Sequence, residues 1–165
     1  MEIFRGKRLW IEKRAIQLPN GSEREKVIVH PNNAVAIFPV DGDRCKLLKQ
    51  FRFAVDRYIY EAPAGTIEPG EDPQKTAHRE LIEETGFAAR TIIPRGYIYT
   101  TPGYTDEKIF LFEARDLSPS VEYGKDEDEI IEVVDIPLCD LRGMISDGTI
   151  VDAKTICLIH HCLGC

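Results

Sequence analysis

Residues 65–87, GTIEPGEDPQKTAHRELIEETGF, determine the local fold around which the rest of this chain is arranged. Asp72 and Pro73 are typical of a helix start, because aspartate caps the first free amides and proline is tolerated in the first turn. Gly86 is typical of the residue just past a helix end. We therefore expect a helix over residues 73–85.

The predicted helix carries a cluster of carboxylates. Glu80 and Glu84 are four residues apart and share one face, with Glu83 alongside. Like charges at this spacing cost a few tenths of a kcal/mol per pair. A cation would remove that cost, and hard oxygen ligands favour Mg2+ or Mn2+. The backbone carbonyl of Ala64, in the preceding loop, is a further candidate ligand. The alternative is a solvated helix face on which Arg79 simply pairs with Glu83.

The spacing across the whole stretch favours a site over a solvated face. It follows the pattern G-x5-E-x7-R-E-U-x-E-E-x-G-U, in which U is a bulky apolar residue. Every fixed position is filled: Gly65, Glu71, Arg79, Glu80, Glu83, Glu84 and Gly86. Only Phe87 departs from the usual aliphatic residue. This pattern is the Nudix box, and the chain resembles the Nudix hydrolase family.

The family resemblance implies an α/β sandwich and metal-dependent hydrolysis of a diphosphate. Roughly two or three Mg2+ ions, or Mn2+, would neutralise the diphosphate and activate water. Glu80, Glu84 and the Ala64 carbonyl would be ligands, and Glu83 would be a ligand or a supporting group held by Arg79.

Composition sets limits that agree with this resemblance. A chain of 165 residues with 43% hydrophobic content predicts one domain over 1–165 with a proper core. A net charge of −7 argues against a nucleic-acid partner. Residues 1–4 are not a charged-then-apolar leader and no apolar run has membrane length, so we expect neither a leader nor a membrane segment. The five cysteines lack the spacing of a disulfide framework, so we expect a cytoplasmic location.

Alternating and apolar segments predict strands on both sides of the box helix. They cover residues 8–18, 27–30, 34–40, 46–52, 58–61, 95–100, 109–114 and 130–136. Helices are expected at 137–145 and 152–163. This order predicts an α/β (α+β) fold in which helices sandwich a mixed sheet, with an N-terminal hairpin in 1–32 ahead of a core in 33–165.

A second resemblance is narrower and covers most of the chain. Pro102 lies sixteen residues after Gly86, within TPGYTDE at 101–107. The segments KQFR at 49–52, EAPAG at 61–65, LPNG at 18–21 and DAKT at 152–155 are also similar to the ADP-ribose pyrophosphatase group. That resemblance implies hydrolysis of ADP-ribose to AMP and ribose 5-phosphate. Pro102 and Gly103 read in isolation are simply a turn.

Substrate contacts and the general base follow from this second resemblance. Arg52 suits phosphate oxygens, although a surface arginine on an edge strand is the alternative. In the ADP-ribose pyrophosphatase group the base comes from an acidic loop, which YGKDEDEI at 123–130 resembles. Matching places the base at Glu127 and a further metal ligand at Glu129, unless this run is a solvated charge cluster. Glu71 is a second candidate base, and Glu107 is a third acidic group.

Recognition of the adenosine depends on a homodimer in this group, whose N-terminal strands reach the partner's site. Arg24, Glu25 and Trp10 lie in the corresponding region. Trp10 can stack on adenine, or serve as a core or dimer contact. Glu25 and Lys26 do not align with the arginine–glutamate pair of the group, which leaves adenine specificity open.

Three rival functions and one side question remain open from the sequence. The rivals are hydrolysis of another nucleotide sugar such as GDP-mannose, a house-cleaning triphosphate hydrolase, and a non-catalytic ligand sensor, which usually loses box carboxylates.

The side question is zinc, because Cys157, His160, His161, Cys162 and Cys165 lie within nine residues. A second well-spaced ligand pair is missing, so packing of a terminal helix is favoured.

Overall fold

The computed structural model describes residues 1–120 and 131–164. An N-terminal antiparallel sheet has the order β1-β2-β3, with bounds Glu2–Arg5, Leu9–Gln17 and Glu23–Pro31. The predicted hairpin turn is confirmed, since the Gly21 amide donates to the carbonyl of Leu18 at 2.8 Å. Strand β1 was not predicted, because four residues are too short to show a periodicity.

The second sheet has seven strands in the order β10-β5-β4-β9-β8, with β6 on β5 and β7 on β4. Strands β4 and β9 are parallel and the remaining pairs are antiparallel, so the predicted mixed sheet is confirmed. The strands are β4 (Ala34–Asp41), β5 (Arg44–Arg52), β6 (Arg57–Glu61), β7 (Ala64–Thr66), β8 (Phe87–Tyr99), β9 (Lys108–Pro119) and β10 (Ile131–Pro137).

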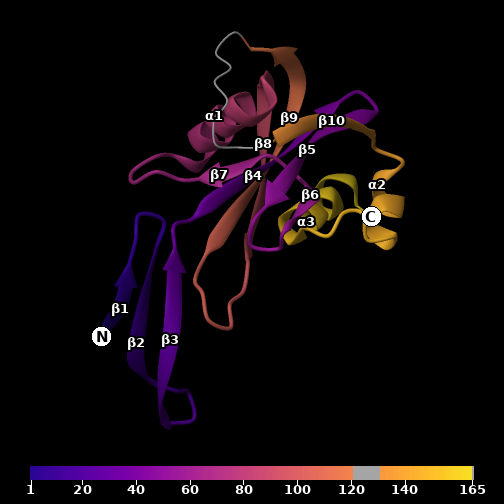
Figure 1. The fold of residues 1–165 in the computed structure, drawn as a ribbon. Coiled ribbons are helices and arrows are strands. Elements are labelled where there is room, and N and C mark those ends of the chain that lie inside the picture. Colours follow the sequence, from indigo (N-terminus) through magenta and orange to yellow (C-terminus); the bar gives the residue numbers. More distant parts are fainter. Residues whose placement is uncertain (121–130, 165) are drawn as a thin grey trace.

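Helices cover both faces of the seven-stranded sheet (Figure 1). They are α1 (Pro73–Thr85), α2 (Leu141–Ser146) and α3 (Ala153–Leu163). The alternation of β4 explains this arrangement, because Ile37 packs in the same core as Leu81 of α1 while Phe38 packs in the same core as Leu158 of α3. The sheet is therefore sandwiched, as expected, and α1 is fixed against its central strands.

Several elements differ from the sequence expectation. Strand β7 lies where a loop was expected, β3 begins at Glu23 rather than at 27, and β9 ends at Pro119 rather than at 114. Strand β8 begins at Phe87, directly after the box helix, rather than near residue 95. A register irregularity between Pro94 and Tyr97, with Gly96 at a φ of 89°, splits its pattern and concealed its first half. Helix α2 begins at Leu141 rather than at 137, since Pro137 still pairs with Arg44 at the end of β10.

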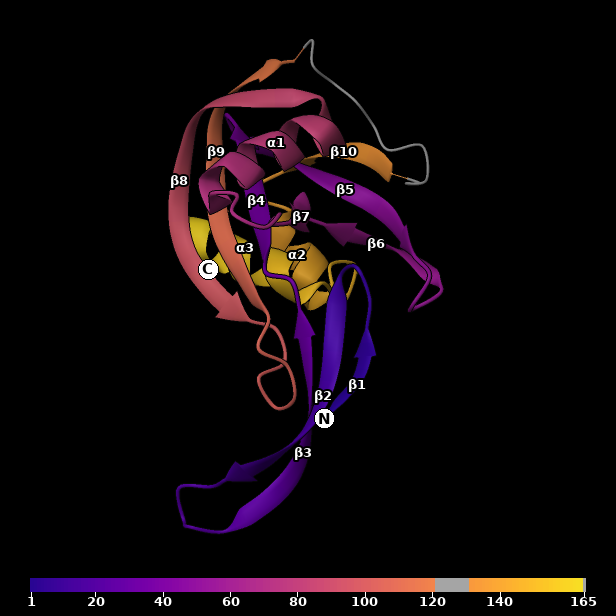
Figure 2. The same cartoon turned by 90° about the vertical axis from the view of Figure 1, so that its left-hand side faces the viewer.

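The N-terminal sheet projects away from the seven-stranded sheet (Figures 1 and 2). Its β3 strand is attached to the loop between β8 and β9. The Val29 amide donates to the Tyr104 carbonyl at 2.9 Å, and His30 Nδ1 lies 2.7 Å from Asp106 Oδ2. None of the described helices has the length and apolarity needed to cross a bilayer.

Candidate active site

The box helix has the limits that the sequence predicted. The Asp72 carboxylate accepts hydrogen bonds from the amides of Gln74 at 2.9 Å and Lys75 at 3.3 Å. At the other end Gly86 has a φ of 75°, and its amide donates to the Ile82 carbonyl at 2.8 Å. A left-handed residue at this position is favoured by glycine. Both caps hold α1, and with it the glutamates, in a defined orientation.

Two of the predicted metal ligands meet the loop that precedes the box. A methyl group added to Gly65 would lie 1.9 Å from the carboxyl carbon of Glu80, so that carboxylate rests directly against the glycine. Glu84 is 7% exposed, and its Oε2 accepts a hydrogen bond from the Ala64 amide at 2.7 Å. The structure therefore brings Glu80, Glu84 and Ala64 together, as expected.

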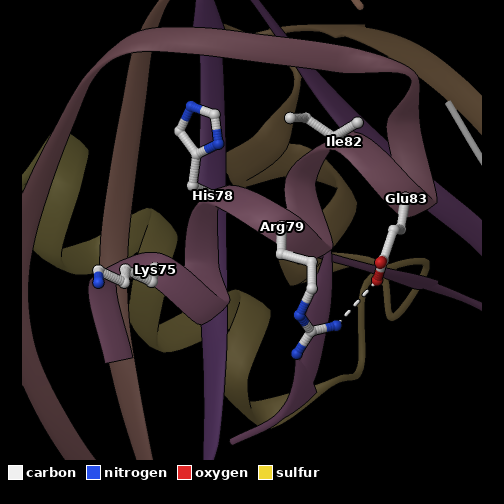
Figure 3. A pocket seen from close by; sticks show the side chains of 5 residues that line it. All are labelled: Lys75, His78, Arg79, Ile82 and Glu83. Atoms are coloured by element: carbon white, nitrogen blue, oxygen red, sulfur yellow. Dashed lines mark hydrogen bonds and ion pairs between the residues drawn. The ribbon is translucent and has the colours of Figure 1, made fainter. Parts of the chain in front are cut away.

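Arg79 binds three box carboxylates, and Figure 3 shows its bond to Glu83. Its Nη1 donates to Glu80 and Glu83 at 2.8 Å each, while Nε and Nη2 donate to the two oxygens of Glu71 at 3.2 Å. The hydrogen bond from Arg79 lowers the pKa of Glu71 to about 2. Glu71 in turn raises the pKa of Arg79, so both groups are charged over the whole physiological range. A hollow of about 400 Å³ lies on this outer face of α1.

The chemistry of the donor set fits a hard divalent cation. Glu80, Glu83 and Glu84 supply carboxylate oxygens, and the adjoining loop supplies backbone. Within residues 1–120 and 131–164, no three acidic, histidine or cysteine side chains are arranged as a ready metal site. In this structure Arg79 bonds Glu80 and Glu83, and the Ala64 amide bonds Glu84. These carboxylates would hold Mg2+ or Mn2+.

Arg52 lies beside the box and is paired with a glutamate that the sequence analysis assigned no role. Its Nε and Nη2 donate to the two oxygens of Glu61 at 2.6 and 2.8 Å. Lys154 of α3 donates to the same carboxylate. Burial alone would raise the pKa of Glu61, but the hydrogen bonds and charges of Arg52 and Lys154 outweigh burial and lower it. The hydrogen bond to Glu61 raises the pKa of Arg52, and the charge of Glu84 adds to this effect.

The first turn of α3 supports the loop that leads into the box. Asp152 caps the helix by accepting from the Thr155 amide at 3.0 Å and the Thr155 hydroxyl at 2.6 Å. The Ala62 amide donates to that hydroxyl at 2.7 Å. Sequence similarity had singled out both EAPAG and DAKT, but it could not show that these segments touch.

The loop with the subgroup proline lies between β8 and β9. Pro102 and Gly103 are exposed and form a turn, in which the Thr105 amide donates to the Thr101 carbonyl at 3.1 Å. Glu107 accepts from the Thr100 hydroxyl at 2.7 Å, at the base of this loop. The loop is docked on β3, so these residues face the junction of the two sheets.

The residues expected at the adenosine are divided between the two ends of the N-terminal sheet. Trp10 pairs in register with Arg5 and His30, its ring stacked on His30 at 3.9 Å and covered by Arg5 at 5.0 Å. It borders a hollow of about 750 Å³ that also reaches Glu71. Arg24 and Glu25 lie near the opposite, hairpin end of β3, and Glu25 pairs with Lys13 at 2.7 Å. One protomer therefore does not bring Arg24 and Glu25 to the box.

Two sets of sequence predictions reach beyond what the structure describes. Glu127 and Glu129 lie outside the described residues, so their roles stay predictions. Of the C-terminal cluster, Cys165 lies outside them too, while Cys162 is half-buried on α3 and burial raises its pKa to about 11. None of the described residues of that cluster belongs to a group of three or more that could hold a metal ion.

The chain is similar to several known proteins. The NUDIX domain model matches residues 30–158. An ADP-ribose pyrophosphatase of Bacillus subtilis (strain 168) is 39% identical over 162 residues, which cover 97% of this chain and 88% of the relative. A GDP-mannose pyrophosphatase of Cronobacter sakazakii (strain ATCC BAA-894) is 35% identical over 136 residues, which cover 78% and 71%.

A solved structure agrees over nearly the full length. The crystal structure of an ADP compounds hydrolase matches with a TM-score of 0.88 at 26% identity, covering 99% of this chain and 89% of that one. The match therefore includes the N-terminal strands as well as the sheet that carries the box. With its box complete and Glu80 and Glu84 of α1 gathered against β7, the chain belongs to the Nudix hydrolase family.

Proposed function

We propose that this protein hydrolyses ADP-ribose to AMP and ribose 5-phosphate. The observation that carries the proposal is the convergence of Glu80 and Glu84 on Ala64 and Gly65 of β7, which begins three residues after the Glu61 that binds Arg52. The similarity to the ADP-ribose pyrophosphatase of Bacillus subtilis extends over 97% of this chain, which favours this substrate.

The reaction joins a water oxygen to one phosphorus of the diphosphate and breaks the bond from that phosphorus to the bridging oxygen. A proton passes from the water to a base, and the two phosphates leave as separate monoesters. Bound Mg2+ would neutralise the diphosphate and acidify the water. Glu80, Glu84 and the Ala64 carbonyl would hold it, with Glu129 as a further ligand, while Arg52 would bind phosphate oxygens.

We assign the general base to Glu127 rather than to Glu71. The bidentate bond from Arg79 keeps the pKa of Glu71 at about 2, and such a weak base is a poor proton acceptor at neutral pH. Glu83 is also bonded to Arg79, in keeping with a supporting role. If Glu127 is the base, Glu127→Gln lowers kcat far more than it raises KM in steady-state assays.

The proposal extends to assembly and location. A homodimer would bring Arg24, Glu25 or Trp10 of one protomer to the partner's site, with Pro102, Gly103 and Glu107 beside the same substrate. The region 1–32 would serve this contact, and 33–165 would form the catalytic core. The free thiols among the described cysteines, namely Cys45, Cys139, Cys157 and Cys162, support a reducing, cytoplasmic location.

Hydrolysis of GDP-mannose is the second candidate, because a relative with that activity in its name covers 78% of the chain. Both substrates present a diphosphate to the same box, so they differ only at the base and the sugar. The residues that would bind those groups lie outside the box.

A competition assay separates the two substrates. The protein and Mg2+ are incubated with equimolar ADP-ribose and GDP-mannose, and the products are resolved by chromatography. We expect AMP and ribose 5-phosphate first; earlier release of GMP would overturn the specificity, and no cleavage of either would overturn the function. Glu84→Gln is the matched control, expected to lose about 10²- to 10³-fold in kcat with an unchanged circular dichroism spectrum.

A further inference from the structure

Glu61 is a buried carboxylate that binds two basic side chains, one from β5 and one from α3. Its side chain is 2% exposed, whereas that of Arg52 is 40% exposed. Lys154, which is 12% exposed, approaches the same carboxylate from α3. Lys154 also binds Asp152, so the four side chains together carry no net charge.

The bonding pattern fixes the plane of the Arg52 guanidinium. Two parallel hydrogen bonds, from Nε and Nη2 to the two oxygens of Glu61, leave the planar guanidinium little freedom to rotate. Nη1 makes no hydrogen bond within the part of the chain that the structure describes. Glu61, which binds Arg52, lies three residues before Ala64, whose amide donates to the box carboxylate of Glu84 at 2.7 Å, so this short segment joins the pair to the box.

Lys154 is itself held firmly by its own helix. Its ammonium group donates to Asp152 at 3.0 Å as well as to Glu61. Asp152 is the N-cap of α3, and Thr155 links that cap to the Ala62 amide. The first turn of α3 therefore fixes the positions of both the Glu61 carboxylate and the backbone that leads to Ala64.

We propose that Lys154 is a positioning residue for the diphosphate, acting through Glu61 on Arg52. Lys154 shares the Glu61 carboxylate with Arg52, so it offsets part of the negative charge that faces the guanidinium. Without Lys154, the side chains of Arg52, Glu61 and Asp152 carry one net negative charge, which disfavours a bound phosphate. This inference rests on the proposed function, since it requires a diphosphate bound beside the box.

The first test compares Lys154→Met with Lys154→Arg and with a matched control. Lys46→Met is that control, because Lys46 is also a nearly buried lysine that pairs with a strand carboxylate, Asp135 at 3.0 Å. Both methionine variants should lower the melting temperature. Only Lys154→Met should lower kcat/KM, by about ten- to hundredfold and mainly through KM, and Lys154→Arg should restore most of it. Equal kcat/KM in Lys154→Met and wild type would overturn the proposal.

A double-mutant cycle tests the route through Arg52. In an Arg52→Gln background, Lys154→Met should change kcat/KM by less than about twofold, because the group on which it acts is gone. A full, additive loss in that background would show that Lys154 acts independently, and would refute the positioning role. The substrate is whichever of ADP-ribose and GDP-mannose the wild type cleaves, so a wrong specificity leaves this test intact. A wild type inactive on both overturns the proposed function itself, and the present inference with it.

Discussion

At the scale of single residues, Gly65 shows how a missing side chain makes room for a carboxylate. The Glu80 carboxylate occupies the space where any other residue would have its Cβ. The end of a glutamate side chain is flexible, so an added methyl group would displace the carboxylate rather than disturb the backbone. Gly65 is therefore needed for where Glu80 points, and only slightly for stability.

Gly65→Ala should accordingly separate activity from stability. We expect kcat to fall by about 10²-fold or more, since one candidate metal ligand moves, while the free energy of unfolding changes by about 1 kcal/mol or less. Steady-state kinetics and urea denaturation measure the two effects. Gly143→Ala in α2, where an added methyl group would meet nothing within 4 Å, should leave kcat unchanged. Wild-type kcat in Gly65→Ala would remove Glu80 from the site.

At the scale of elements, Arg79 and Glu71 tie the loop before α1 to the helix. Because the folded-state pKa of Glu71 is about 2, below its unfolded value of about 4.3, the ionised carboxylate stabilises the fold above the unfolded pKa. That contribution is lost as the pH falls from about 5 to about 2. Solvent screening reduces it to about 1–2 kcal/mol at neutral pH, since Arg79 is 34% exposed.

Glu71→Gln should therefore destabilise the metal-free protein at pH 7 and converge with the wild type in acid. The free energy of unfolding is measured by urea titration in the presence of a chelator, at several pH values from 7 to 3. Glu68→Gln is the control, because Glu68 is an exposed carboxylate on the same loop whose side chain makes no ion pair with the described residues. A wild-type to Glu71→Gln difference that stays constant with pH would contradict the assignment.

Elements also show why the sequence predicted some parts of the site and missed others. The limits of α1 depend on Asp72 and Gly86, which act within one turn and are visible locally. The Lys154–Glu61 contact joins residues 93 positions apart, and no local pattern encodes it. Strand β8 was half missed for a related reason, since its irregularity at Gly96 interrupts the alternation that identifies a strand.

At the scale of the whole molecule, the N-terminal sheet exposes apolar side chains that one protomer leaves uncovered. Val27 of β3 is 50% exposed, and Ile3 and Phe4 are exposed to a similar degree. A dimer formed through this sheet would bury them. The same contact would bring Arg24 and Glu25 towards a partner's site.

Val27→Glu should weaken such a dimer, because a charge would have to be buried in the contact. Sedimentation equilibrium should give the mass of two chains for the wild type and a shift towards one chain for Val27→Glu. Val133→Glu, at an exposed position on β10, should keep the wild-type mass. A wild-type mass of one chain, or an unchanged mass in Val27→Glu, would argue against a dimer through this sheet.

The stacked ring of Trp10 has a practical consequence for work in solution. It is the only tryptophan of the chain, and it lies in the N-terminal sheet between Arg5 and His30. Indole emission therefore reports on that sheet alone, while far-ultraviolet circular dichroism averages over both sheets and the helices. Heating curves from the two signals would coincide only if the projecting strands and the catalytic sheet melt as one cooperative unit.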